Sequence, residues 1–288
     1  MRMGRWRLGS DTALGVVRLS VNVNKVATLR NSRGGAVPSV TAAVEACLDA
    51  GVPGITVHPR GDERHITRRD VREVAALLAP LRGRVEYNIE GDPRPDLIEL
   101  VHEIRPDQVT LVPVLPGEIT SQAGWPVDTP RGELETAIGC LRGAGMRVSL
   151  FVDPEPAPIE WAAALGADRV ELFTEPYARA YGRSEAEGRA SFESYARAAE
   201  KAHALGLGIN AGHDLDLENL RLFATLPHLD EVSIGHALMS RALFVGLDRV
   251  VREYLELLRR SASPAASTAS AVSSSSSRSS SGDPEGPG

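Results

Sequence analysis

Four of the seven histidines lie at or just beyond the ends of short β-branched runs. His58 ends the run GITVHP, His213 follows LGIN, His236 ends EVSIGH, and His65 lies a few residues beyond His58. Glu90 ends a similar run, RVEYNIE. Histidine titrates near neutral pH, and partial burial raises the pKa of a carboxyl group, so both side chains suit proton transfer. His58, Glu90 and His213 are therefore candidates for acid and base catalysis.

Cations and glycines accompany these candidates. The segment VNVNKVATLRNSRGG carries Lys25, Arg30 and Arg33 and ends in two glycines. We expect a loop here that closes over an anion and neutralises it by charge-assisted hydrogen bonds. The segments NAGHD and SIGHAL contain Gly212 and Gly235, which permit the backbone to approach a phosphate closely. The sequence thus indicates two anion sites on either side of the proton-transfer residues, as a pair of phosphorylated substrates would need.

Eight short apolar runs recur along the chain, each followed by a polar loop and a segment of helical period. The runs are nearly continuous in apolar residues, as strands covered on both faces are. Eight such units predict an α/β protein with the (β/α)8, or TIM-barrel, fold. A doubly wound sheet is the second choice, because no glycine-rich dinucleotide turn follows the first run. The predicted strands are residues 16–23, 54–59, 84–90, 108–113, 147–153, 169–174, 207–210 and 231–236, and the clearest predicted helices are residues 39–51, 95–104, 132–145, 158–167 and 194–206.

A (β/α)8 barrel builds its active site at the carboxyl ends of its strands. The candidates above would therefore meet at one end of the barrel, together with the other polar residues that follow the runs. Those residues are Asn22, Asn24, Arg60, Asn88, Thr120, Ser121, Asp153, Glu171, Thr174, Glu175, Asn210, Asp214 and Ser233.

The two ends of the chain differ from this pattern. We expect residues 1–15 to be a flexible N-terminus and residues 16–260 to form the catalytic barrel domain. Residues 261–288 consist almost entirely of Ser, Ala, Pro and Gly. Such a segment buries too little apolar surface to offset its ordering entropy, so we expect a disordered Ser-rich C-terminal tail.

The composition argues against several classes of protein. A net charge of −6 provides no basic surface for nucleic acid. No run of about 18 apolar residues is present to span a membrane, and the N-terminus lacks the apolar core of a signal peptide. Cys47 and Cys140 lie in apolar helical patterns and are expected to be buried thiols in a reducing compartment. These features predict a cytoplasmic protein without nucleic-acid or membrane partners.

The strand-end segments also carry a family resemblance. VNVNKVATLRNSRGG, GITVHPRGDERHI, EYNIEG, DQVTLVP, GLGINAGHDL and EVSIGHAL occur in this order within residues 17–258 and resemble the pyridoxine 5′-phosphate synthase family of vitamin B6 biosynthesis. The resemblance implies a barrel with extra helices that assembles as a homo-octamer, a tetramer of dimers. It also implies a transferase that condenses 1-deoxy-D-xylulose 5-phosphate with 3-amino-2-oxopropyl phosphate. The products would be pyridoxine 5′-phosphate, phosphate and water, formed with no metal and no organic cofactor.

The resemblance assigns a role to each site residue. The implied proton-transfer residues are His58, Glu90 and His213. The implied contacts of the amino-ketone phosphate are Asn22, Arg33, Asp214, Gly235 and His236, and those of deoxyxylulose phosphate are Asn24, Lys25, Arg60, His65 and Thr120. The better-known form of the family has Asp-His in place of Asn24 and Lys25 and Gly in place of Asp214, whereas a second branch shares these three replacements. Lys25 keeps the cation that a ketose phosphate needs, and Asp214 is expected to offer only its backbone N–H.

The implied reaction moves protons at every stage. An imine forms between the two substrates, enolisation and loss of water and phosphate follow, and ring closure precedes a second dehydration. Glu90 is the expected base for carbon-bound protons, His58 a second base, and His213 the acid for departing hydroxyls.

Three other functions stay open at this point. A metal-dependent barrel hydrolase could use His58, Glu90 and His213 as ligands, although the chain has no His-x-His pair. A Schiff-base aldolase could use Lys25, and borohydride trapping with substrate would reveal it. A non-catalytic phosphate-binding barrel would keep the anion sites without the chemistry, and an activity assay would distinguish it from an enzyme.

Overall fold

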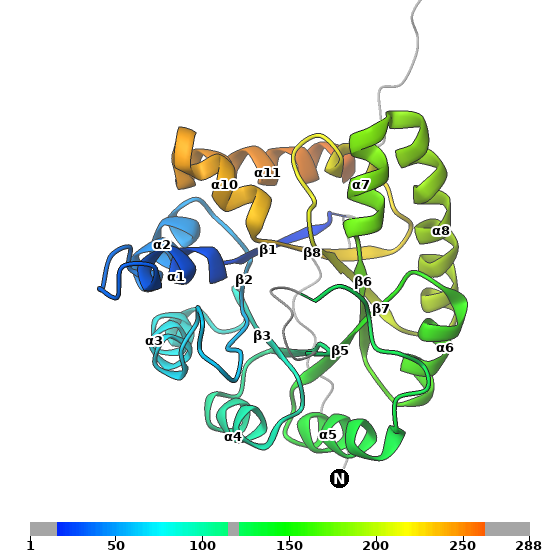
Figure 1. Cartoon of the computed structure of the whole chain (residues 1–288), viewed down its shortest axis with the longest axis horizontal. Helices are drawn as coiled ribbons and strands as arrows, with labels where there is room; N and C mark the ends of the chain where they lie inside the picture. The colour runs from blue at the N-terminus through cyan, green and yellow to red at the C-terminus, as the bar shows by residue number, and fades with distance from the viewer. Residues whose placement is uncertain (1–15, 115–120, 263–288) are drawn as a thin grey trace, which may run out of the picture.

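Eight parallel strands form a closed barrel in chain order in the computed structural model, which describes residues 16–114 and 121–262 (Figure 1). The strands are β1 Arg18–Asn22, β2 Gly54–Val57, β3 Glu86–Gly91, β4 Gln108–Leu111, β5 Arg147–Val152, β6 Arg169–Phe173, β7 Gly208–Gly212 and β8 Leu229–Ile234. The barrel closes where β8 pairs with β1, for example Val232 with Leu19. The predicted (β/α)8 fold is confirmed.

Helices surround the barrel and connect consecutive strands (Figure 1). They are α1 Asn24–Asn31, α2 Val40–Asp49, α3 Arg68–Leu78 with the 3₁₀ turn η2 Ala79–Leu81, α4 Pro95–Ile104, α5 Arg131–Gly143, α6 Pro156–Ala164, α7 Glu175–Arg183, α8 Glu185–Ala204, α9 Leu220–Phe223, α10 His236–Val245 and α11 Leu247–Ala262. Two helices follow each of the strands β1, β6 and β8. The first of each pair begins directly after its strand, so the extra helices lie at the carboxyl end of the barrel.

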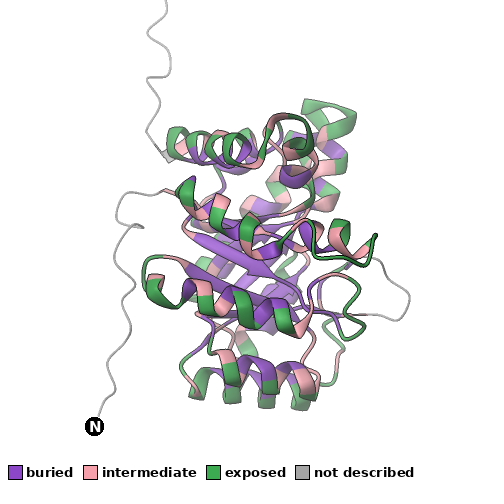
Figure 2. Ribbon diagram, turned by 90° about the vertical axis from the view of Figure 1, so that its left-hand side faces the viewer, coloured by how far each residue is buried: buried purple, intermediate pink, exposed green. Residues whose placement is uncertain are grey.

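The two faces of the strands are both buried but differ in character. The outward side chains, such as Leu19 and Val21, belong to the apolar core between barrel and helices. Figure 2 shows that the ribbon of the barrel strands is coloured mostly as buried. The inward side chains that alternate with them are polar. The hydroxyl of Ser20 lies 2.7 Å from that of Thr56, and Asn88 donates to the Thr56 hydroxyl at 3.3 Å. The apolar character expected of the strands therefore holds only for their outer faces. The polar interior of this barrel is unusual, because the interiors of such barrels are more often filled by Val, Ile and Leu.

Charged residues fill the barrel at the amino-terminal ends of the strands. Glu86 on β3 accepts hydrogen bonds from Arg18 on β1, at 3.0 Å, and from Arg147 on β5. Arg169 on β6 donates to Asn210 at 2.6 Å. A buried charge without a partner is costly, so these pairings allow charged side chains to fill the amino-terminal end of the barrel.

The segment after β1 was expected to be a loop that closes over an anion, and this expectation is wrong for residues 24–31. They form helix α1, which begins two residues after the strand ends. Arg30 on this helix is paired with Asp70 on α3, so its guanidinium is already neutralised within the chain.

All eight strands differ by one or two residues from the predicted limits at one end or both, and the changes in β7 and β8 concern the candidate site. β7 continues to Gly212, because Gly212 pairs with Phe173 on β6. β8 ends at Ile234, and His236 is the first residue of α10. The polar residues therefore lie one or two positions nearer to or farther from the strand ends than predicted, but at the same end of the barrel.

The two thiols differ. Cys47 on α2 is buried, and burial raises the pKa of its thiol to about 12. Cys140 on α5 is exposed, contrary to prediction, and its Sγ lies 3.2 Å from Nε2 of His102. The buried residues of α5, among them Ile138 and Leu141, follow helical spacing, and Cys140 falls on the opposite side.

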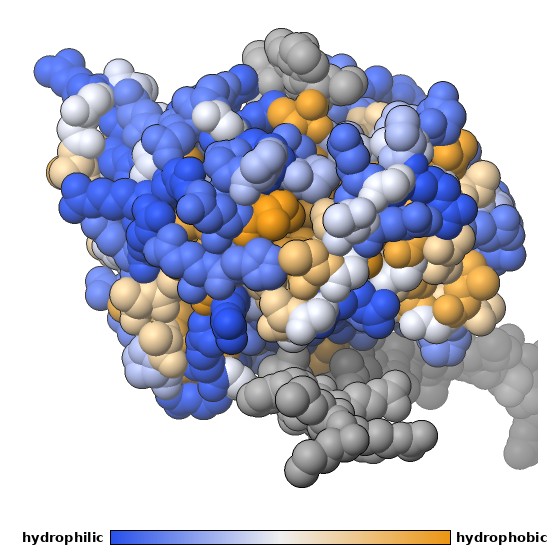
Figure 3. Space-filling view, turned by 90° about the horizontal axis from the view of Figure 1, so that it is seen from below, coloured by the Kyte–Doolittle hydropathy of each residue, from blue (hydrophilic) through white to orange (hydrophobic). Residues whose placement is uncertain are grey.

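The surface of the molecule is formed by the outer faces of the helices. On the side of α4 and α5, hydrophilic side chains predominate and apolar ones form small separate areas (Figure 3). Within residues 16–114 and 121–262, no helix has the length and apolar character needed to cross a membrane. Helix α11 extends to Ala262, two residues past the predicted domain limit. The predicted flexible N-terminus and nearly all of the predicted Ser-rich tail lie outside the described residues.

Candidate active site

A cavity of about 280 Å³ opens at the carboxyl ends of the strands. It is lined by Asn22, Asn24, Lys25, His58, Arg60, His65, Glu90, Val112, Ser121, Glu171, His213, Asp214, Ser233, Ile234, Gly235, His236 and Ala237. The structure thus brings together all the residues to which the family resemblance assigned a role, except Arg33 and Thr120. Arg33 is exposed on the connection between α1 and α2, and Thr120 lies outside the described residues. Ser121, the next residue, lines the cavity.

His58 and Glu90 form the centre of the cavity. They follow or end the neighbouring strands β2 and β3, and Nδ1 of His58 lies 3.7 Å from Oε2 of Glu90. Asn22, at the end of β1, donates to the same carboxylate oxygen at 3.4 Å. Nε2 of His58 is buried and has no hydrogen-bond partner within the described part of the chain. A polar nitrogen left unpaired in the protein interior is rare and marks His58 as a functional candidate.

The surroundings shift the two pKa values in opposite directions. Burial, followed by the charges of His65 and Arg60, lowers the pKa of His58 well below its ordinary value. Burial, followed by the carboxylates of Glu171 and Glu231, raises the pKa of Glu90 well above its ordinary value. Both shifts favour the uncharged forms, so this pair is poised for proton transfer rather than held as an ion pair.

His213 lies across the cavity, just after β7. Its backbone φ is +88° and that of Asp214 is +56°, a region that residues other than glycine seldom adopt. The hydroxyl of Thr174 holds this turn, because it lies within hydrogen-bond distance of the carbonyls of Gly212, at 2.6 Å, and His213. The His213 ring lies 4.9 Å from that of Phe151, and burial lowers its pKa.

Nδ1 of His213 is also buried without a partner among the described residues. Both cavity histidines, His58 and His213, therefore carry a buried ring nitrogen that no described residue pairs. Such unpaired polar atoms are rare in protein interiors and mark both rings as candidates for contact with a substrate.

Glu171 is a residue of the cavity to which the sequence assigned no role. Its Oε2 is buried without a partner in the described chain, and burial raises its pKa to about 7. A Cβ atom at Gly212 would lie 2.6 Å from Oε1 of Glu171, so this glycine makes room for the carboxylate and not for a phosphate. The available signal was a glutamate in the middle of the apolar strand RVELF, because a carboxylate is rarely buried without a function or a partner.

Two helices begin at the cavity wall. α10 starts at His236, and Gly235, His236 and Ala237 all line the cavity, so its N-terminal N–H groups are placed to receive an anion. α1 starts at Asn24, after the neighbouring strand β1, which pairs with β8. Gly235 also lies close to Asn22, since a Cβ atom there would be 3.1 Å from the Asn22 Cβ.

The side of the cavity near α1 carries the cations. Lys25 and Arg60 line it beside the neutral ring of His65, and the exposed fraction of Arg60 is 5%. The side-chain oxygen of Asn24 accepts the backbone N–H of His58 at 2.9 Å, so Asn24 ties α1 to the end of β2. This arrangement suits one phosphate group on the cation-rich side and a second at the start of α10.

No group of three or more His, Cys, Asp and Glu side chains in residues 16–114 and 121–262 is arranged to hold a metal ion.

Comparison with solved structures supports the fold. 3-Hexulose-6-phosphate synthase from Salmonella typhimurium matches with a TM-score of 0.57 at 14% identity, over 85% of this chain and all of that one. Phosphoribosyl anthranilate isomerase from Thermus thermophilus matches with a TM-score of 0.53 at 16% identity, over 85% of this chain and 99% of that one.

Comparison of sequences is more specific. Pyridoxine 5′-phosphate synthase of Bacteroides fragilis is 52% identical over 245 residues, which cover 85% of this chain and the whole of that protein. The protein of the same name from Leptospira biflexa is 49% identical over 253 residues, 84% of this chain and 97% of that one. The family model of the pyridoxal phosphate biosynthesis protein PdxJ matches residues 19–260, the whole barrel. This chain therefore belongs to the PdxJ family.

Proposed function

We propose that the protein is a pyridoxine 5′-phosphate synthase, as its relatives are named. It condenses 1-deoxy-D-xylulose 5-phosphate with 3-amino-2-oxopropyl phosphate and releases phosphate and water. The observation that carries this proposal is the convergence of His58, Glu90 and His213 on one cavity, with an unpaired ring nitrogen on each histidine. The reaction needs several proton transfers around two joined substrates, and this geometry supplies them from opposite sides.

Each proton-transfer group has a role that fits its surroundings. Glu90, whose pKa is raised by burial, is the base that removes carbon-bound protons. His58 is a second base. His213 is the acid for departing hydroxyls, and it must first gain a proton, which its low pKa opposes in the empty cavity. Two bound phosphates would favour the protonated imidazole by their negative charge.

The two phosphates occupy the two ends of the cavity. The amino-ketone phosphate lies at the start of α10, in contact with Asn22, Gly235 and His236, with Asp214 and Arg33 as further contacts. The deoxyxylulose phosphate lies near Asn24, Lys25, Arg60 and His65, with Thr120 as a further contact. The proposal is supported by the helix N-terminus at the first position and the gathered cations at the second. No metal or organic cofactor is required by this scheme.

We also propose that the chain forms a homo-octamer, a tetramer of dimers, in the cytoplasm. Leu243 and Phe244 at the end of α10 are 72% and 88% exposed, and such large apolar side chains favour a contact between subunits. Cys47 and Cys140 are unpaired thiols, which suits a reducing compartment. Sedimentation equilibrium should give the mass of eight chains, and a monomer at working concentration would reject this assembly.

The test of the function is product formation from both phosphorylated substrates after exhaustive chelation. The wild type should form pyridoxine 5′-phosphate, and Glu90→Gln should lower kcat by about 10²–10⁴. Glu133→Gln on the exposed side of α5 is the control and should retain activity. Equal activity of Glu90→Gln would move the base elsewhere. A folded wild type without product, or with activity only after metal addition, would reject the synthase assignment.

A further inference from the structure

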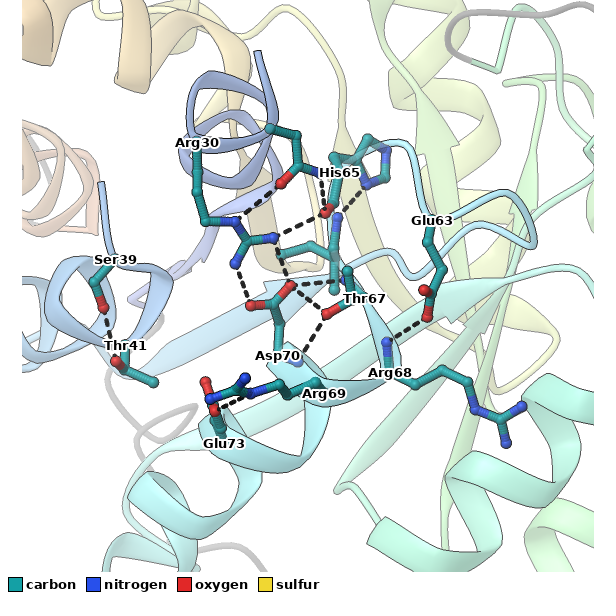
Figure 4. Close-up of polar contacts among 12 residues, drawn as sticks. Arg30, Ser39, Thr41, Glu63, His65, Thr67, Arg68, Arg69, Asp70 and Glu73 are labelled. Atoms are coloured by element: carbon teal, nitrogen blue, oxygen red, sulfur yellow. Dashed lines mark hydrogen bonds and ion pairs between the residues drawn. The ribbon is translucent and has the colours of Figure 1, made fainter. Parts of the chain in front are cut away.

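Helix α1 is fastened to the first turn of α3 by a buried ion pair (Figure 4). Both terminal nitrogens of Arg30 donate to the carboxylate of Asp70, and Nη2 does so at 2.8 Å. The two side chains are only 13% and 5% exposed. Two parallel N–H···O bonds fix both position and orientation, so this contact is more restrictive than a surface ion pair.

The same helix holds the backbone of His65. Nη2 of Arg30 donates to the His65 carbonyl at 3.2 Å, and Nδ2 of Asn31 donates to it at 2.8 Å. Asn31 is oriented in turn, because its side-chain oxygen accepts Nε of Arg30 at 2.9 Å. Figure 4 shows these contacts converging on one carbonyl. The carbonyl of His65 thus has two donors from α1, and both depend on Arg30.

The imidazole of His65 is also fixed. Its Nδ1 accepts the backbone N–H of Ile66 at 2.8 Å, which leaves the proton of the neutral ring on Nε2. Burial and the nearby charges of Arg60 and Lys25 lower the pKa of His65 to about 4. The ring therefore remains a neutral N–H donor on the cavity wall throughout the physiological pH range.

We propose that Arg30 and Asp70 are positioning residues for the cation-rich side of the cavity. By locking α1 against the start of α3 and the connection that precedes it, they hold Lys25 on one element and His65 on the other, and both of these residues line the cavity. This proposal rests on the proposed function for the identity of that phosphate, which belongs to deoxyxylulose 5-phosphate. Arg30 acts through these neighbours and does not line the cavity.

Asp70 has a second task that must be separated from this one. Its Oδ2 accepts the backbone N–H and the hydroxyl of Thr67 at 2.8 Å each, which forms the capping box of α3. Thr67→Ala removes the capping hydroxyl and leaves the Arg30–Asp70 pair in place. Arg30→Met removes the pair and leaves the cap. Asp70→Asn keeps the volume and removes the charge, and serves if Arg30→Met fails to fold.

The first experiment measures KM for each substrate separately. Arg30→Met and Asp70→Asn should raise KM for deoxyxylulose 5-phosphate about tenfold, because small displacements of binding groups are costly, and change KM for the amino ketone less than twofold. Thr67→Ala should lower the melting temperature without changing either KM. Equal increases in both KM values for Arg30→Met, or an unchanged KM for deoxyxylulose phosphate, would overturn the proposal.

The second experiment does not depend on catalysis. Inorganic phosphate is titrated into each protein by calorimetry, and the binding event that His65→Gln removes is assigned to this side of the cavity. Its affinity should fall about tenfold in Arg30→Met and stay unchanged in Thr67→Ala. If the affinities change in this way but the wild type forms no product, the synthase function is rejected and the positioning role is kept. Equal phosphate affinity in all these variants would reject the positioning role whatever the activity.

Discussion

Nδ1 of His58 lies 3.7 Å from Oε2 of Glu90, and the pKa of the histidine is lowered while that of the glutamate is raised. An ordinary His–Glu pair at this distance would attract a proton to the imidazole and keep the carboxylate charged. Here burial opposes both charges, so neither group is locked in its ionised form. In the empty cavity the proton therefore stays on Glu90 and none is added to His58, so a bound substrate must draw the proton from this pair.

The pH dependence of activity should reveal the raised pKa of Glu90. Because the base must be ionised to act, kcat/KM should increase with pH, and the midpoint of this acidic limb should lie above the value of about 4.3 for an unperturbed glutamate. The profile is measured with the amino ketone as the varied substrate. Glu90→Gln should lose this limb together with most of the activity. A wild-type limb centred near pH 4.3 would show that Glu90 is solvated in the working enzyme.

The stability of the barrel should decrease with rising pH because of Glu231. Burial, followed by the charge of Glu86, raises its pKa to about 8, although Arg18, Arg169 and Arg147 oppose the shift. A carboxyl whose pKa is raised on folding stabilises the protein below its unfolded pKa, near 4.3, and this contribution is lost as the pH rises through 8.

Glu231→Gln removes the ionisation and should remove that loss. The free energy of unfolding of the variant minus that of the wild type should be larger at pH 9 than at pH 5, by on the order of 3 kcal/mol. Urea unfolding at both pH values measures it. The same pH dependence in both proteins would mean that the surrounding arginines keep Glu231 charged throughout.

Gly212→Ala should disturb the cavity through Glu171. The new methyl group would lie 2.6 Å from Oε1 of Glu171, and the carboxylate must move. We expect activity to fall about 10–100-fold, because the displaced carboxylate faces the substrate. The free energy of unfolding should fall by about 1–3 kcal/mol.

Gly139→Ala is the matched control for this substitution. Gly139 lies inside helix α5, and a Cβ atom there would meet nothing within 4 Å among the described residues. Alanine should keep full activity and leave stability unchanged or increase it by up to about 1 kcal/mol. If both alanine variants retain activity, the carboxylate of Glu171 has room to move and its position is not required.

The sequence by itself determined the barrel and the end of it that carries the chemistry. Apolar runs alternating with helical segments are local patterns, and the rule that parallel strands present their carboxyl ends together places His58, Glu90 and His213 on one side. The order of eight units left little choice of topology. Residue types such as His236 after a strand and Gly235 before it also marked the start of an anion-binding helix.

Only the tertiary structure decided which of these residues are free and which are used by the fold. Arg30 seemed suited to bind an anion, but Asp70, forty residues further on, pairs with it. Gly212 was expected to approach a phosphate, and instead leaves space for Glu171. The polar barrel interior, the burial that shifts the pKa of Glu90, and the strained turn at His213 likewise depend on contacts between strands far apart in the sequence. Local patterns fix where a side chain starts, whereas its partner and its distance from water are fixed by the packing of the whole chain.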